Sequence, residues 1–117
     1  MRLTYHITPM EVWDNLPASI PYAATSLADE GFIHCTDGAA NMVTTANRHY
    51  RSDPRPYYLL TIDLEATGSP WRFDHGKLLY PHIYGPVNRT AVLLVQPFPR
   101  RADGEFLPFV EVASGTL

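Results

Sequence analysis

The sequence predicts an α+β fold in a single small domain that spans residues 1–117. Patterns typical of helices, with capping residues, are confined to the first half of the chain. The second half alternates strand-like runs with turns rich in Pro and Gly. No linker, internal repeat or low-complexity tract divides the chain. We therefore expect two helices packed on a mainly antiparallel β-sheet.

The chain should begin with a strand that leads directly into a helix. Apolar and polar side chains alternate over residues 2–8, which predicts a strand with one apolar face. Thr8 can then cap a helix in which Pro9 suits the first turn and Glu11 completes a capping box. This helix should end near Leu16.

A short turn and the second helix are predicted before residue 51. Ser26 can cap a short turn that Gly31 closes. A longer helix over residues 38–50 can be capped by Thr36 or Asp37. Its expected apolar face consists of Ala39, Met42, Val43, Ala46 and Tyr50.

The segment 32–36 is predicted to be the second strand. Alternation places His34 and Thr36 on one side and Ile33 and Cys35 on the other. The apolar pair should pack under the following helix. The polar pair is either satisfied within the core or lines a site, and we expect it to line a cleft.

Strands dominate the remainder of the chain. The run 57–64 is continuously apolar and predicts a central strand, and 71–75 predicts a shorter one. Prolines and a glycine make 78–87 an irregular or edge segment. A buried strand is expected over 91–98, and 106–112 could return beside it across an Asp-Gly turn.

Composition excludes several classes of protein. The net charge is −3 and the charged residues are scattered, so there is no strong signal of nucleic-acid binding. The single cysteine permits no intrachain disulfide, which favours a reducing compartment. There is no apolar run long enough for a secretory signal or a membrane helix. We expect a soluble cytoplasmic protein of unknown oligomeric state.

Three histidines are the main candidates for a functional site. His6 and His34 lie opposite the apolar sides of their strands, and His82 lies in the irregular segment. If the three converge they form a cleft of hydrogen-bonding imidazoles, with His34 and His82 as candidate catalytic residues. Arg48 is a candidate for holding a phosphate or carboxylate.

Other chemistries are less well supported. Three histidines can bind zinc, but no closely spaced pair is present, so no metal is expected. Cys35 points away from His34 and is expected to be a small buried hydrophobe and not a nucleophile. No paired carboxylates and no phosphate-binding glycine loop are evident.

The order of these segments resembles a bacterial family. The segments TYHIT, TSLADEGFIHCT, YLLTIDL and LYPHIYGPV are similar to those of the domain-of-unknown-function 952 family. The resemblance covers about residues 3–106. That family implies no particular reaction.

A more distant resemblance implies a ligand. Residues 5–8 are similar to the Tyr-His-Gly-Thr segment that opens the ADP-ribosyltransferase fold, and residues 34–36 to a His-Leu-Ser segment of tRNA 2′-phosphotransferases. In that superfamily the first histidine faces the NAD pocket and the second strand forms the opposite wall. This sequence departs from the pattern at Ile7, which replaces the glycine. No glutamate is clearly placed for transfer, Glu111 being a remote candidate.

The resemblance implies an ADP-ribosyltransferase-like fold with a split β-sheet. It also implies a pocket for NAD, as a substrate, or for an ADP-ribose derivative. Its ligand-binding residues would be His6, Ser26, Thr36, Arg48 and Tyr84, together with the candidate catalytic histidines. ADP-ribose transfer is the reaction implied, although the sequence does not decide whether the domain is an enzyme. Two alternatives remain open, a binding module without catalysis for another small polar ligand and a histidine-based metal site.

Overall fold

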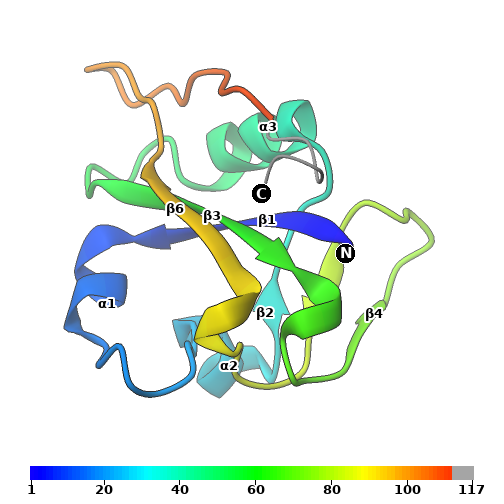
Figure 1. The fold of residues 1–117 in the computed structure, drawn as a ribbon. Coiled ribbons are helices and arrows are strands. Elements are labelled where there is room, and N and C mark those ends of the chain that lie inside the picture. Colours follow the sequence, from blue (N-terminus) through cyan, green and yellow to red (C-terminus); the bar gives the residue numbers. More distant parts are fainter. Residues whose placement is uncertain (112–117) are drawn as a thin grey trace.

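The computed structural model describes residues 1–111, in which all the α-helices precede strand β3 (Tyr57–Asp63) and strands follow it (Figure 1). The strands are β1 Leu3–Pro9, β2 Ile33–His34, β3 Tyr57–Asp63, β4 Trp71–Phe73, β5 Pro81–Ile83 and β6 Val92–Pro97. The helices are α1 Met10–Asn15, α2 Thr25–Glu30 and α3 Ala39–His49, with 3-10 turns at Leu64–Ala66 and Arg89–Ala91. The predicted α+β class is confirmed, with three α-helices in the described part of the chain instead of two. None of these helices is long and apolar enough to cross a membrane.

The sheet is split into two three-stranded antiparallel sheets. One has the order β1-β3-β6 and the other the order β2-β5-β4. They meet where the backbones of Tyr5 and Thr36 exchange two hydrogen bonds, of 3.0 and 2.8 Å. Figure 1 shows α3 on one side of the β1-β3-β6 sheet and β2 with α2 on the other. The central strand β3 is therefore buried on both faces, as its apolar run predicts.

Two hydrophobic clusters fill the two faces of the first sheet. The cluster under α3 includes Met42 and Ala46, which confirms the predicted apolar face of that helix. The other cluster joins the two sheets. Ile33 and Cys35 are buried there, against strand β3 residues such as Leu60, and not under α3 as the alternation suggested.

The predicted roles of three segments are corrected by the sheet topology. β5 is the central strand of its sheet and not an edge, because Pro81 occupies only its first position, where its carbonyl accepts from Cys35. β6 is a half-buried edge strand. Residues 106–111 form no strand beyond a bridge between Arg100 and Phe106, and Val112 lies outside the described residues.

Helix capping differs from the predictions. Thr8 stays in the β1 ladder opposite Tyr58, so α1 starts after Pro9 without a capping box. The residues before α2 and α3 are Ala24 and Gly38, and neither Ser26 nor Thr36 caps a helix. The closure of α2 by Gly31 in the left-handed conformation is confirmed.

Candidate functional site

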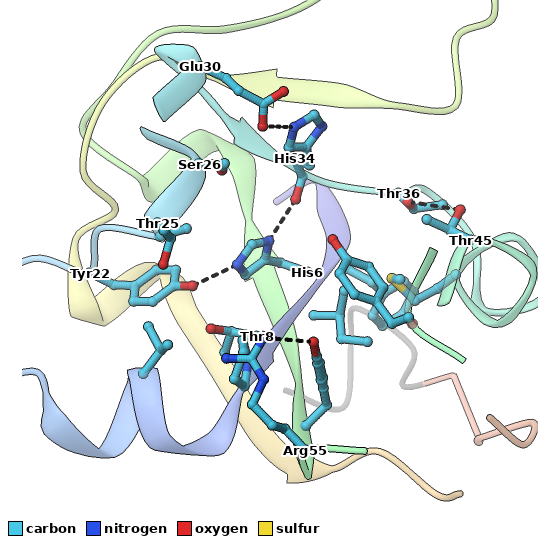
Figure 2. A pocket seen from close by; sticks show the side chains of 18 of the residues that line it. His6, Thr8, Tyr22, Thr25, Ser26, Glu30, His34, Thr36, Thr45 and Arg55 are labelled. Carbon is cyan, nitrogen blue, oxygen red and sulfur yellow. Dashed lines mark hydrogen bonds and ion pairs between the residues drawn. The ribbon is translucent and has the colours of Figure 1, made fainter. Parts of the chain in front are cut away.

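A polar cleft lies where β1 passes β2, and we call it the His6 cleft. It encloses about 360 Å³ between β1, α2, β2 and α3. Figure 2 shows His6 at its centre, with Tyr22 to one side and His34 above. Its polar lining consists mainly of Thr8, Thr25, Ser26, Glu30, Thr36, Thr45 and Arg55.

His6 is held in one neutral form. Its Nδ1–H donates to the carbonyl of His34 at 2.6 Å, and its Nε2 accepts from the Tyr22 hydroxyl at 2.7 Å. The side chain is 5% exposed, and this burial lowers the pKa of His6 to about 4. His6 therefore connects β1 to β2 and presents an uncharged ring edge to the cleft.

His34 is an exposed residue and not part of the core. Its side chain is 47% exposed, and its Nε2–H donates to the Glu30 carboxylate at 2.9 Å. Glu30 is the last residue of α2, four positions before His34. This contact puts a carboxylate beside an imidazole at the mouth of the cleft.

Arg55 supplies a positive charge at the opposite end of the cleft. Its guanidinium contacts Asp53 at 2.8 Å and Glu11 at 2.9 Å, and remains half exposed. Hydrogen bonds from Arg55 and then from the Tyr57 hydroxyl hold the pKa of Asp53 well below its usual range. A bound anion would have to share this guanidinium with the two carboxylates.

A second depression adjoins the first, and we call it the His82 hollow. It encloses about 550 Å³, and Glu30, His34, Thr36, Thr45 and Tyr50 line both it and the His6 cleft. His82 and Arg48 line only the hollow. Because β2 and β5 are paired in register, the His34 and His82 rings lie 5.4 Å apart.

The structure brings together most of the predicted site residues. His6, Ser26 and Thr36 line the cleft. Tyr84 lines neither depression, since its hydroxyl donates to Asp74. Glu111 accepts a hydrogen bond from Tyr5 and is likewise outside both.

Sequence reasoning missed Tyr22, Glu30 and Arg55 as site residues. The four-residue spacing of Glu30 and His34 was a usable signal, because α2 ends between them. Tyr22 lies in a connecting segment, and nothing local indicates its contact with His6, sixteen residues earlier in the chain. Arg55 reaches the cleft from the loop before β3.

The geometry also bears on two other kinds of site, a cysteine nucleophile and a metal site. Burial raises the pKa of the Cys35 thiol well above its usual range, so this residue is a poor nucleophile. Within residues 1–111, no group of three or more His, Cys, Asp or Glu side chains is placed to hold a metal ion.

Comparison with known proteins identifies relatives of the same fold. The crystal structures of protein CC0527 from Caulobacter crescentus, including a double mutant, superpose with a TM-score of 0.69 at 28% identity. They cover 91% of this chain and 94% of that protein. A solution structure of CC0527 gives a TM-score of 0.66 at 24% identity, over 89% and 90% of the two chains. No curated protein matches. The family model described as "Protein of unknown function (DUF952)" matches residues 7–95, and the chain therefore belongs to this family.

Proposed function

We propose that the His6 cleft binds NAD or an ADP-ribose derivative and that the domain transfers ADP-ribose from NAD. One observation carries the proposal. His6 of the first strand and His34 of the second line one cleft, joined by a 2.6 Å hydrogen bond across the division between the sheets. This is the arrangement expected from the resemblance of residues 5–8 and 34–36 to the ADP-ribosyltransferase segments.

The lining of the cleft suits a ribose with a diphosphate. Hydroxyl groups of Thr8, Thr25 and Ser26 can exchange hydrogen bonds with ribose oxygens. The Arg55 guanidinium is the cationic group available for phosphate oxygens. A neutral His6 adds no charge that would have to be desolvated when a ligand binds.

Transfer requires stabilisation of a ribosyl cation as nicotinamide leaves. Glu30 is the carboxylate nearest to His34 at the cleft mouth, and we assign it the role of facing this developing charge. His34 orients the carboxylate by its hydrogen bond. A covalent nucleophile is not part of the proposal, because the thiol of Cys35 is buried and protonated.

The first test is ligand binding. Thermal unfolding of the purified protein should be measured with NAD, ADP-ribose, AMP and divalent metal salts. A ligand at 100 times its dissociation constant stabilises the folded state by about 2.7 kcal/mol. We expect NAD and ADP-ribose to stabilise the domain, while AMP and the metals do so less.

His34→Ala should separate binding from stability. We expect the affinity for ADP-ribose to fall by about 1–3 kcal/mol, roughly five- to 150-fold, through lost hydrogen bonds. The free energy of unfolding should change by about 1 kcal/mol or less, because the side chain is half exposed. Arg101→Ala, remote from both depressions, is the control. Absence of NAD and ADP-ribose binding by the wild type would reject the proposal, and binding without nicotinamide release would leave a binding module.

A further inference from the structure

His82, which lines the His82 hollow, is paired with a carboxylate that the proposed binding role does not use. His82 Nδ1–H donates to Asp74 at 2.7 Å. Asp74 also accepts from the Tyr84 hydroxyl and, at 2.7 Å, from Arg72 Nε. These two donors, Tyr84 first, hold the pKa of the Asp74 carboxyl well below its usual range. The carboxylate thus stays ionised, and its contact with Nδ1–H fixes the tautomer of the His82 ring.

The other ring nitrogen of His82 is open. Its Nε2 has no hydrogen-bond partner among the described residues, yet it is not among their fully enclosed polar atoms. The side chain is only 6% exposed, and its ring stacks on Phe32 at a centroid distance of 4.1 Å. Because His82 lines the hollow, we assign this lone pair to it, and contacts with Asp74 and Phe32 hold the ring in place.

His82 lies beside the cleft in which the ribose is proposed to bind. His34 borders both depressions, and its ring lies 5.4 Å from that of His82. A nucleophile bound in the hollow would therefore approach a ribose held in the His6 cleft from the side of His82. A general base must lie within hydrogen-bond reach of the proton it removes, and this geometry provides one.

We propose that the His82 hollow is the acceptor site and that His82 is the general base for a hydroxyl acceptor. The hydroxyl oxygen forms a bond to ribose C1′ as the bond from C1′ to the nicotinamide nitrogen breaks. The electron pair of that bond leaves with nicotinamide, and the hydroxyl proton passes to His82 Nε2. Asp74 is a positioning residue that stabilises the imidazolium formed. The identity of the electrophile rests on the proposed function.

The charges of the hollow select the acceptor class. Arg48 and Glu30 both line it, but the Glu30 carboxylate is paired with His34, whereas Arg48 makes no ion pair with any described residue. The unpaired charge of the hollow is therefore positive, which disfavours a guanidinium or ammonium acceptor. A carboxylate acceptor would need no base. A hydroxyl carried by an anionic molecule, such as a sugar phosphate, uses both the base and the arginine.

The test compares two acceptors in NAD-dependent nicotinamide release. Glycerol 3-phosphate represents an anionic alcohol and agmatine a guanidinium. We expect release to be faster with glycerol 3-phosphate. His82→Gln should lower kcat by roughly 10²–10⁴-fold while the dissociation constant of NAD stays within about twofold. Asp74→Asn should lower kcat with an unchanged KM, and Asp74→Glu should restore part of it. Arg101→Gln is the control that should leave both constants unchanged.

Several results would overturn this inference. One is full turnover by His82→Gln, and another is faster nicotinamide release with agmatine than with glycerol 3-phosphate. The third is that the wild type binds NAD but releases no nicotinamide with either acceptor. Hydrolysis of p-nitrophenyl acetate tests the base without NAD. The wild type should exceed an equal concentration of free imidazole, and His82→Gln should not. If NAD does not bind, the proposed function and the acceptor role both fail. If the wild type then hydrolyses p-nitrophenyl acetate no faster than imidazole does, the role of His82 as a base is rejected as well.

Discussion

The charge state of His6 affects the stability of the domain. Both ring nitrogens are engaged in neutral hydrogen bonds, and a second proton would force the Tyr22 hydroxyl to change from donor to acceptor. Burial lowers the pKa of His6 from 6.5 to about 4. The unfolded chain therefore takes up this proton at a higher pH than the folded domain does.

The free energy of unfolding should accordingly fall on acidification. The contribution of His6 is fully present above about pH 6.5 and is lost as the pH falls toward 4, by roughly 2–3 kcal/mol between pH 7.5 and 4.5. Urea unfolding at these two pH values measures the loss. His6→Gln should remove it, whereas His49→Gln, at an exposed position, should retain it. A ring titration by NMR that puts the pKa of His6 near 6.5 would contradict this expectation.

Single residues also show how far the sequence can predict the site. Alternation within two strands is a local signal, and it was enough to select His6, His34 and Thr36. The contacts that define their roles are not local. Tyr22 reaches His6 from a loop, and Asp74 reaches His82 across the β4–β5 pair. No spacing rule predicts such contacts, because the chain between the partners has no regular period.

Among the elements, α2 positions the carboxylate of the site. Glu30 and Ser26 both belong to this six-residue helix. It ends at Gly31, whose φ of 88° lies in the left-handed region that favours glycine. A Cβ at this position would meet no atom within 4 Å, so only backbone strain opposes a side chain.

Gly31→Ala should therefore destabilise the domain by about 1–2 kcal/mol. Gly76 is a matched control, because a Cβ there also meets nothing within 4 Å and its φ is not positive. Gly76→Ala should be neutral or stabilising by up to about 1 kcal/mol. Chemical unfolding of both variants provides the comparison, and similar losses in the two would show that the αL conformation of Gly31 is not needed.

Errors at the level of elements have a common cause. Helix starts were predicted from side chains that can cap, yet Thr8 and Thr36 are used by backbone pairing between strands. Proline was taken to exclude a central strand, but a short strand tolerates it at the first position. In each case tertiary pairing overrides a local preference.

At the scale of the whole molecule, the fold class could be predicted because helices and strands separate along the chain. The division into two sheets could be anticipated only from family resemblance. It depends on the pairing of Tyr5 with Thr36 and of Tyr22 with Val87, which are distant in sequence. The candidate site lies along this division between the sheets. The residues that form it are therefore brought together by the fold and do not belong to one contiguous sequence motif.

The loop between α3 and β3, which carries Arg55, is held in place by one arginine. The Arg100 guanidinium donates to the carbonyls of Arg55 at 2.8 Å, Tyr50 at 3.0 Å and Arg51 at 3.1 Å, and also to that of Asp53. It lies 4.3 Å from the centre of the Phe106 ring. The loop after α3 is thereby fastened to the segment after β6.

Replacing Arg100 should loosen this closure and destabilise the entire domain. Arg100→Met keeps the aliphatic stem but leaves several carbonyls without their donor, and we expect a loss of roughly 2–3 kcal/mol in the free energy of unfolding. Arg101→Met removes a neighbouring arginine whose exposed contact with Glu105 spans 2.9 Å, and it should change stability by less than about 0.5 kcal/mol. Urea unfolding of the two variants tests the difference. Equal losses would mean that water replaces the guanidinium at these carbonyls, and that the loop needs no fastening to keep Arg55 at the cleft.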